Sequence, residues 1–358
     1  MTKHPLLTPY VSKALNLKNR VVMAPLTRRR ATDDHIPTDM MRIHYGQRAS
    51  AGLIIAEATN ISPQGTGYIN SPGIYARKQV EAWKPVTGEV HKKGGVIYLQ
   101  LWHVGRVSHP LLQPGGELPV SASAIKASGM ISTPKGQKEM VVPRALEKQE
   151  IKNIIDDYVK AALNAMEAGF DGVEIHSANG YLLDQFLHDG SNIRADEYGG
   201  SIENRARFLM EVTEKICDAI GNEKTAVRLS PSGIYKDMFD SNPVELFDYV
   251  VDKLNRFELA YLHILEPMVE LKPEEKYKKY LKEVTPHFRR VFHGTLITNC
   301  GFDFDSANKI IADGNADLVA FGKLFISNPD LVERFAAGTP LKPWDENTFY
   351  KGGERGYI

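Results

Sequence analysis

Eight short apolar runs, separated by segments with helical periodicity, constrain the fold of this chain more than any other feature. Short β-branched runs bounded by Gly or Pro are typical of buried strands, and strands that alternate with helices form parallel sheets. The runs occupy residues 21–24, 53–56, 96–101, 173–175, 226–229, 261–264, 296–298 and 318–321. Eight such units predict an α/β fold closed into a (β/α)8 TIM barrel.

An open doubly wound sheet is the competing arrangement. It would carry a glycine-rich turn after the first strand. Residues 24–27 instead read Ala-Pro-Leu-Thr. The length of 358 residues fits one barrel, because such barrels run to about 250 residues or more as one unit. We therefore predict a single barrel domain over residues 1–358.

A long excursion interrupts the alternation after the third strand. Residues 103–146 are rich in proline and glycine, and a loop of this length in a compact domain is usually a lid or a binding loop. The β-prone Val120 and residues 140–142 predict a hairpin within it. The helical period returns from Glu150, in a stripe made of Ile151, Ile154, Ile155, Tyr158, Ala162, Leu163 and Met166.

Residues that favour helix ends support these boundaries. Thr38 and Ser201 are predicted N-caps, and Pro243 is placed to open a helix after Asn242. Cys217 lies on the apolar face of the helix that follows Ser201, which predicts a core residue rather than a reactive thiol.

The composition excludes several classes of protein. Lys plus Arg and Asp plus Glu are both 44, and the basic residues are not gathered as a nucleic-acid surface requires. Two cysteines are too few for a disulfide framework or an iron-sulfur cluster, and His103 and His109 lack the spacing of metal ligands. No signal peptide or membrane span is evident. We expect a cytoplasmic protein without a metal, a membrane or a nucleic-acid partner.

Polar residues follow the apolar runs around the predicted ring. The carboxyl ends of barrel strands carry the active site, so these positions are candidates. The candidates after the runs are Thr27, Ala58, His176, Asn179, Asn299, Cys300, Gly301, Gly322 and Lys323, while Gln100 lies near the end of the third run and Arg228 within the fifth. A distribution around the whole ring suits a large planar ligand lying across the barrel mouth.

Three candidates have competing interpretations. Gly301 and Gly322-Lys323 occupy the position where barrels commonly hold phosphate, but both glycines could be ordinary turn residues. Arg228 inside an apolar strand needs a partner, because an unpaired buried charge costs several kcal/mol. An anionic ligand would serve, and so would the structural carboxylate of Glu174.

The segment 174–181 moves from an apolar strand into hydrogen-bonding side chains. His176 and Asn179 can hold a substrate oxygen, and the hydroxyl of Tyr181 can give up a proton. The alternative is that His176 is a satisfied core histidine and Tyr181 a packing residue.

Together these motifs resemble the Old Yellow Enzyme family of flavin-dependent ene-reductases, closest to its N-ethylmaleimide, nitrate-ester and morphinone reductase branch and to the oxophytodienoate reductases. The matching stretches lie in order along nearly the whole chain. They are residues 23–28, 48–54, 100–103, 174–181, 198–205, 321–322 and 328–331.

The resemblance implies FMN, bound without a covalent bond, and NADPH or NADH as its reductant in ping-pong kinetics. The residues expected to contact FMN are Pro25, Leu26, Thr27, Ala58, Gln100, Arg228, Asn299, Cys300, Gly301, Phe321, Gly322 and Lys323. His176 and Asn179 would bind the substrate oxygen and Tyr181 would donate a proton. Tyr68, Trp102 and Tyr350 would form pocket walls.

The implied substrates are α,β-unsaturated carbonyl compounds, maleimides and nitro compounds, with nitrate esters and nitroaromatics as further candidates. Two positions depart from the usual family pattern. Asn179 stands where some relatives carry a second His, and Lys323 stands where Arg is usual. A phosphate-binding barrel of lyase or isomerase type and a non-catalytic flavin-binding protein are the alternatives. We expect a monomer or a homodimer.

Overall fold

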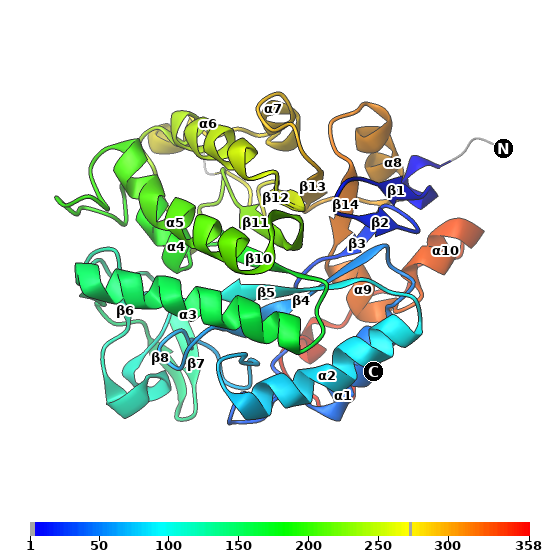
Figure 1. Cartoon of the computed structure of the whole chain (residues 1–358), viewed down its shortest axis with the longest axis horizontal. Helices are drawn as coiled ribbons and strands as arrows, with labels where there is room; N and C mark the ends of the chain where they lie inside the picture. The colour runs from blue at the N-terminus through cyan, green and yellow to red at the C-terminus, as the bar shows by residue number, and fades with distance from the viewer. Residues whose placement is uncertain (1–3, 272–273) are drawn as a thin grey trace.

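Eight parallel strands close into a barrel in the computed structural model, which describes residues 4–271 and 274–358 (Figure 1). All eight strands follow one another around the ring in chain order, and β14 pairs with β3 to close it. The predicted TIM barrel is confirmed. The strands are β3 (Val21–Met23), β4 (Leu53–Asn60), β5 (Ile97–Trp102), β10 (Gly172–Ser177), β11 (Thr225–Leu229), β12 (Tyr261–Leu265), β13 (Leu296–Asn299) and β14 (Leu318–Phe321).

Every residue of these eight strands is buried. Helices cover the outside of the ring and side chains fill its interior, so both faces of each strand need apolar residues. This explains why the strands appear in the sequence as continuous apolar runs rather than as alternating patterns.

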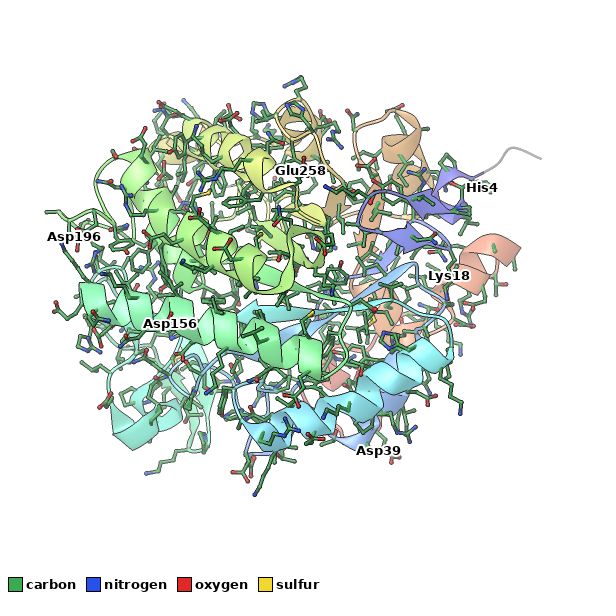
Figure 2. All side chains as sticks on the ribbon, viewed as in Figure 1. His4, Lys18, Asp39, Asp156, Asp196 and Glu258 are labelled. Carbon is green, nitrogen blue, oxygen red and sulfur yellow. The ribbon has the colours of Figure 1, made fainter. Side chains whose placement is uncertain are left out.

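Helices surround the barrel. Their charged faces point outward, as the exposed helical residues Asp39 and Asp156 show (Figure 2). The helices are α1 (Asp39–Gln47), α2 (Arg77–Lys92), α3 (Lys148–Glu167), α4 (Leu182–Leu187), α5 (Ile202–Ile220), α6 (Pro243–Leu254), α7 (Thr285–Arg289), α8 (Phe304–Ala312), α9 (Lys323–Ser327) and α10 (Leu331–Ala337).

The predicted helix ends are mostly confirmed. The hydroxyl of Ser201 accepts a hydrogen bond from the Asn204 amide, Pro243 opens α6, and Cys217 is buried. Thr38 stands at the N-cap of α1, but its hydroxyl donates to the carbonyl of Arg30 and makes no cap. The prediction for Leu163 was wrong, since this residue is 49% exposed on α3.

The excursion contains a hairpin, but not where the sequence indicated. Strands β7 (Met130–Thr133) and β8 (Gly136–Glu139) pair antiparallel, whereas Val120 belongs to β6 (Val120–Ser121), which pairs parallel with β9 (Arg144–Ala145). The turn at residues 134–135 leads into Gly136 at φ 85°, a conformation that glycine adopts without steric cost. The position of the hairpin is therefore determined by the residues of its turn and not by the β-propensity of the surrounding residues.

A second hairpin, β1 (Tyr10–Val11) and β2 (Asn16–Leu17), lies on the opposite side of the molecule from β7 and β8 (Figure 1). The chain end is held against α1, where the Tyr357 ring stacks on His44 at 3.9 Å between centroids. Within residues 4–271 and 274–358, no helix has the length and apolar character that crossing a bilayer demands.

Candidate active site at the carboxyl end of the barrel

A cavity of about 560 Å³ opens where the barrel strands end. The loops after β3, β4, β10 and β11 contribute to its lining, together with the excursion and the C-terminal segment. Eight of the residues proposed from the sequence line it: Pro25, Leu26, Thr27, Tyr68, Asn179, Tyr181, Lys323 and Tyr350. Segments far apart in the chain therefore meet at the position predicted for the site.

His176, near the end of β10, is buried beside this cavity. Its ring lies parallel to that of Trp102, with centroids 6.2 Å apart, and meets the edge of Tyr181 at 5.1 Å. Burial, aided by the charge of Arg228, holds the pKa of His176 well below 6.5, so the imidazole is neutral. Its Nδ1 has no hydrogen-bond partner in the described part of the chain. The interpretation of His176 as a satisfied core histidine is therefore disfavoured.

The turn after β10 is held through its backbone. Asn179 and Gly180 have φ angles of 59° and 77°. The Asn179 amide donates to Ser230 Oγ at 2.9 Å, and the Gly180 amide donates to Asp184 Oδ2 at 2.8 Å. Within the described residues, Asn179 Oδ1 is buried without a partner. The backbone contacts thus fix the turn and leave the Asn179 side chain free to bind a ligand.

Tyr181 places a phenol at the wall of the cavity. Its hydroxyl lies 3.1 Å from that of Tyr68, and its ring packs edge-on against Trp102 with centroids 4.8 Å apart. Trp102 is itself fixed by a hydrogen bond from Nε1 to Asn60 Oδ1 at 2.8 Å. Burial raises the pKa of Tyr181 well above 10, so the hydroxyl keeps its proton at neutral pH. The group is suited to donating that proton during a reaction.

A polar network inside the barrel orients Gln100. Gln100 Nε2 donates to Glu174 Oε1 at 2.7 Å, and His263 Nδ1 donates to Glu174 Oε2 at 2.8 Å. A carboxylate only accepts hydrogen bonds, so the NH2 group of Gln100 must face Glu174. The carbonyl oxygen of Gln100 is then left as the acceptor for a ligand.

Arg228 lies beside this network. Burial lowers its pKa while the nearby Glu174 carboxylate opposes the shift. Burial also pushes the pKa of Glu174 upward, but His263 and Arg228 outweigh it and the net shift is downward. Arg228 Nη2 donates to Asn299 Oδ1 at 3.3 Å, and Nε is buried without a partner in the described residues. Glu174 therefore balances the charge of Arg228 without using all of its donors.

The predicted phosphate region combines unusual backbone with open space. Cys300 and Gly301 have φ angles of 80° and 82°, and no atom lies within 4 Å of where a Cβ at Gly301 would be. A Cβ on Gly322 would approach Leu26 to 3.2 Å. Burial raises the pKa of Cys300 to about 11, which makes a reactive thiolate unfavourable. Lys323 Nζ lies 3.4 Å from Glu346 Oε1 and can turn between this carboxylate and a phosphate.

These groups satisfy the requirements of a bound flavin mononucleotide. The pyrimidine edge of a flavin carries carbonyl oxygens that accept hydrogen bonds and an N–H group that donates one. The free donor of Arg228 and the free acceptor of Gln100 match these two kinds of group. Open backbone at Gly301 and the cation of Lys323 match a phosphate. The remaining predicted contacts are buried: Ala58 lies in β4, and Phe321 ends β14.

Several lining residues were not found from the sequence. They are Arg29, Ile131, Tyr235, Lys236, Met268 and Phe349. All lie in loops or in the hairpin, and no motif within any one of these segments indicates a site. The one local indication of a binding site is the pair Tyr235-Lys236, which follows a barrel strand. Aromatic and basic residues at such positions are typical of binding loops.

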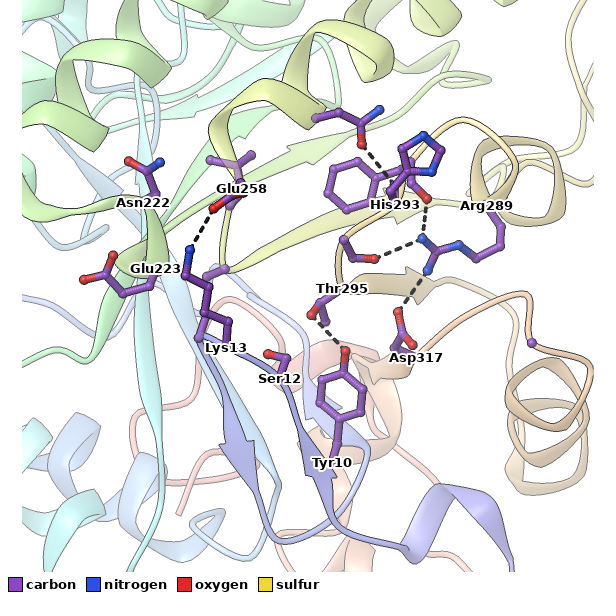
Figure 3. A pocket seen from close by; sticks show the side chains of 17 residues that line it. Tyr10, Ser12, Lys13, Asn222, Glu223, Glu258, Arg289, His293, Thr295 and Asp317 are labelled. Atoms are coloured by element: carbon purple, nitrogen blue, oxygen red, sulfur yellow. Dashed lines mark hydrogen bonds and ion pairs between the residues drawn. The ribbon is translucent and has the colours of Figure 1, made fainter.

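A larger cavity, of about 720 Å³, lies at the amino end of the barrel (Figure 3). Four of its charged groups form two ion pairs: Arg289 Nη1 donates to Asp317 Oδ2 at 3.0 Å, and Lys13 Nζ donates to Glu258 Oε2 at 2.7 Å. Within the described chain, no residue lining it has a buried polar atom without a partner. The smaller cavity is therefore the candidate site, because of these two cavities it is the one with unsatisfied polar groups in the described residues. In the described residues no cluster of three His, Cys, Asp or Glu could hold a metal.

Residues 5–342 match the NADH:flavin oxidoreductase / NADH oxidase family, and the chain belongs to this family of Old Yellow Enzyme type. It is accordingly a flavin-dependent oxidoreductase. The predicted resemblance is confirmed at this level.

Individual relatives are similar over nearly the whole chain. The 12-oxophytodienoate reductase 1 of Oryza sativa subsp. japonica is 47% identical over 352 residues, which cover 97% of this chain and 90% of the relative. The Old Yellow Enzyme homologue from Zymomonas mobilis superposes with a TM-score of 0.93 at 45% identity, covering 98% of both chains. Morphinone reductase in complex with tetrahydroNAD has a TM-score of 0.91 at 47% identity and covers 98% of this chain and 96% of its own.

Proposed function

We propose that this protein is an FMN-dependent ene-reductase that uses NADPH or NADH to reduce the activated C=C bond of an unsaturated carbonyl or nitro compound. One observation carries the proposal. A neutral imidazole, an amide and a protonated phenol, from His176, Asn179 and Tyr181, meet at one cavity, and the first two have buried atoms without partners in the described chain. Buried polar groups are nearly always hydrogen-bonded, and a substrate bound in this cavity would complete these two side chains.

FMN would be held by groups on three sides. Thr27 and Gln100 would bind the ring edge, Arg228 would offset negative charge on the ring, and Gly301 with Lys323 would hold the phosphate. The other contacts would come from Pro25, Leu26, Ala58, Asn299, Cys300, Phe321 and Gly322. When bound, FMN supplies hydride chemistry, accepting two electrons from the nicotinamide and passing them to the alkene.

The side chains of the chain would perform the remaining tasks. His176 and Asn179 would bind the carbonyl or nitro oxygen and polarise the conjugated alkene, which lowers the energy of the negative charge that develops there. Tyr181 would deliver its proton to the α-carbon as the β-carbon receives hydride. Burial keeps that proton on the phenol until the carbon becomes basic.

The walls of the cavity favour a largely apolar substrate. Tyr68 and Tyr350 line the cavity, Trp102 packs beside it against Tyr181, and Met130, Tyr235 and Met268 extend the apolar rim outward with exposed fractions of 41–52%. Enones, maleimides and nitroalkenes fit this chemistry, with nitrate esters and nitroaromatics as further candidates. The complex of morphinone reductase with tetrahydroNAD supports a nicotinamide coenzyme as the reductant. A monomer or homodimer in the cytoplasm remains a prediction.

The experiment that tests this function follows the absorption spectrum of the purified protein under anaerobic conditions. Flavin bands should bleach on addition of NADPH or NADH and return with 2-cyclohexenone. Bands that never bleach would indicate a flavin-binding protein without turnover. A protein that stays colourless after incubation with FMN would contradict the proposal and favour a phosphate-binding barrel of lyase or isomerase type.

A further inference from the structure

The proposed substrate cavity carries positive charge that the ene-reductase chemistry does not require. Among the described residues its lining includes Arg28, Arg29, Lys236 and Lys323 and no aspartate or glutamate. This one-sided lining occurs in a chain whose acidic and basic residues balance at 44 each. A cleft lined by one sign of charge attracts ligands of the opposite sign.

Two of these cations already have partners. Arg28 donates to the carbonyls of Phe349 at 2.9 Å and Gly356 at 2.6 Å, which ties down the C-terminal segment. Lys323 lies beside Glu346 and is expected at the flavin phosphate.

The other two cations have no acidic partner. Arg29 makes one side-chain hydrogen bond, from Nε to the carbonyl of Ile69 at 3.2 Å. Lys236 Nζ lies over the ring of Tyr235, 4.9 Å from its centroid. Among the described residues no carboxylate forms an ion pair with either side chain. Their charge is therefore available to a ligand.

The backbone around Lys236 is held in an uncommon conformation. Lys236 and the next residue, Asp237, have φ angles of 61° and 59°, which residues other than glycine seldom adopt. The excursion locks them there: Arg106 Nη2 donates to the Lys236 carbonyl at 3.0 Å, and Ser128 Oγ donates to Asp237 Oδ1 at 2.8 Å. Strain that is enforced by neighbours in this way is concentrated at ligand sites.

The same loop packs directly on the proposed catalytic turn. A Cβ on Gly180 would lie 2.9 Å from the Tyr235 carbonyl oxygen and 3.1 Å from Lys236 Cβ, so only glycine permits this approach. Asp237 forms no ion pair with Lys236 in the described chain: its carboxylate is directed at Ser128, although its charge still acts on Lys236 through space. The ammonium of Lys236 thus shares the cavity with Asn179 and Tyr181.

We propose that Lys236, supported by Arg29, binds an anionic group carried by the molecules that react in this cavity. The group is a carboxylate or phosphate, on the unsaturated substrate or on the nicotinamide coenzyme. This inference rests on the proposed ene-reductase function and adds the substrate class. Lys236 acts as a point charge at a partly exposed position, so it selects for charge and tolerates varied geometry.

A matched pair of substrates tests the inference. 3-Maleimidopropionate and N-propylmaleimide share the reacting alkene and differ in the terminal carboxylate. Lys236→Gln should lower kcat/KM for the acid about 10-fold and leave the neutral maleimide within about twofold. Lys236→Arg should retain most of the preference. Lys138→Gln, which removes an exposed lysine of β8 outside the cavity lining, is the control.

A second pair distinguishes the two sources of the anion. NADPH and NADH differ by one phosphate, and the rate of flavin reduction by each is measured anaerobically. A selective loss with NADPH in Lys236→Gln assigns the anion to the coenzyme, and a selective loss with the acid maleimide assigns it to the substrate. Either result supports the inference.

Equilibrium binding provides a measurement without turnover. The saturated products, 3-succinimidopropionate and N-propylsuccinimide, should perturb the flavin spectrum, and only the acid should bind more weakly to Lys236→Gln. If Lys236→Gln does not fold, the same measurements are made on Lys236→Asn, because Asn tolerates a positive φ angle.

Unchanged acid-to-neutral and NADPH-to-NADH ratios in both variants would overturn this inference alone. If the wild-type protein failed to reduce N-propylmaleimide at all, the proposed function itself would fail.

Discussion

The two ends of the barrel both carry cavities lined by charged and aromatic residues, yet they differ in how their polar groups are satisfied. At the amino end Arg289 meets Asp317, and the hydroxyls of Tyr10 and Thr295 lie 2.8 Å apart. At the carboxyl end His176 and Asn179 keep buried atoms without partners within the described chain. The amino-end cavity is the larger at about 720 Å³ against 560 Å³.

Unsatisfied polar groups, rather than volume, therefore favour the carboxyl-end cavity as the candidate site. A buried polar atom without a partner costs about 1–3 kcal/mol, so it persists where a ligand completes it. Paired groups at the amino end contribute to stability instead, as the bottom face of such barrels generally does. Variants at the two ends should therefore affect different measurements.

The largest expected effect is that of Tyr181→Phe on reoxidation of the flavin by 2-cyclohexenone. Loss of a positioned general acid should slow this half-reaction about 10³-fold, while reduction by NADPH stays within about threefold. Anaerobic stopped-flow absorbance measures both rates. Tyr68→Phe, which removes the hydroxyl 3.1 Å from that of Tyr181, is the milder control. Equal slowing of both half-reactions would mean that Tyr181 is not the proton donor.

His176→Phe should lower kcat/KM for 2-cyclohexenone about 100-fold, because one donor to the developing negative charge is removed. The wild-type oxidative half-reaction should also show no inflection near pH 6.5. The pKa of His176 is held well below that value by burial, so the ring stays neutral as the pH falls from 8 to 6. An inflection that disappears in His176→Phe would contradict this assignment.

Glu57, buried beneath the carboxyl-end loops, should make stability depend on pH. Burial raises its pKa from 4.5 to about 7, although the Arg28 amide and the Tyr45 hydroxyl donate to it. The folded protein holds this proton more tightly than the unfolded chain, so stability falls as the pH rises from 4.5 to 7.

Relative to Glu57→Gln, the wild-type protein should lose about 3 kcal/mol of unfolding free energy over this interval. Urea denaturation at several pH values measures the difference. Parallel pH profiles for the two proteins would show that folding does not raise the pKa of Glu57.

The smallest effect is expected at the amino end. Asp317→Asn weakens a partly exposed ion pair with Arg289 and should cost about 1 kcal/mol of unfolding free energy. Turnover with 2-cyclohexenone should stay within about twofold. A large loss of activity in a normally folded protein would contradict the conclusion that the amino-end residues contribute to stability and not to turnover.

The barrel could be predicted from the sequence because each strand is buried on both faces and therefore forms a continuous apolar run. Short helices such as α4 (Leu182–Leu187) and α9 (Lys323–Ser327) were missed, since a helix of one or two turns shows no full period. The hairpin was misplaced because Val120 has the propensity of a strand, whereas the turn before Gly136 determined the pairing.

The polar centre of the candidate site, made of Gln100, His176 and Arg228, could be predicted because these residues lie at or near the ends of apolar runs. The rim could not be predicted in the same way. Tyr235, Met268 and Phe349 come from separate loops whose meeting depends on the closed ring. The partner of Gln100 was also not foreseen. Glu174 was considered for Arg228, but the register β5–β10 places it directly opposite Gln100.

The carbonyl stretch of bound 2-cyclohexenone tests the central claim most directly. Infrared difference spectra with ¹³C-labelled ketone on the oxidised protein report how strongly the site polarises that bond. We expect a stretch shifted to lower frequency in the wild-type protein and in Asp317→Asn, and a value close to that in water or above it in His176→Phe. An unshifted stretch in the wild-type protein, or the same shift in His176→Phe, would contradict the assignment of the carboxyl-end polar groups to the substrate oxygen.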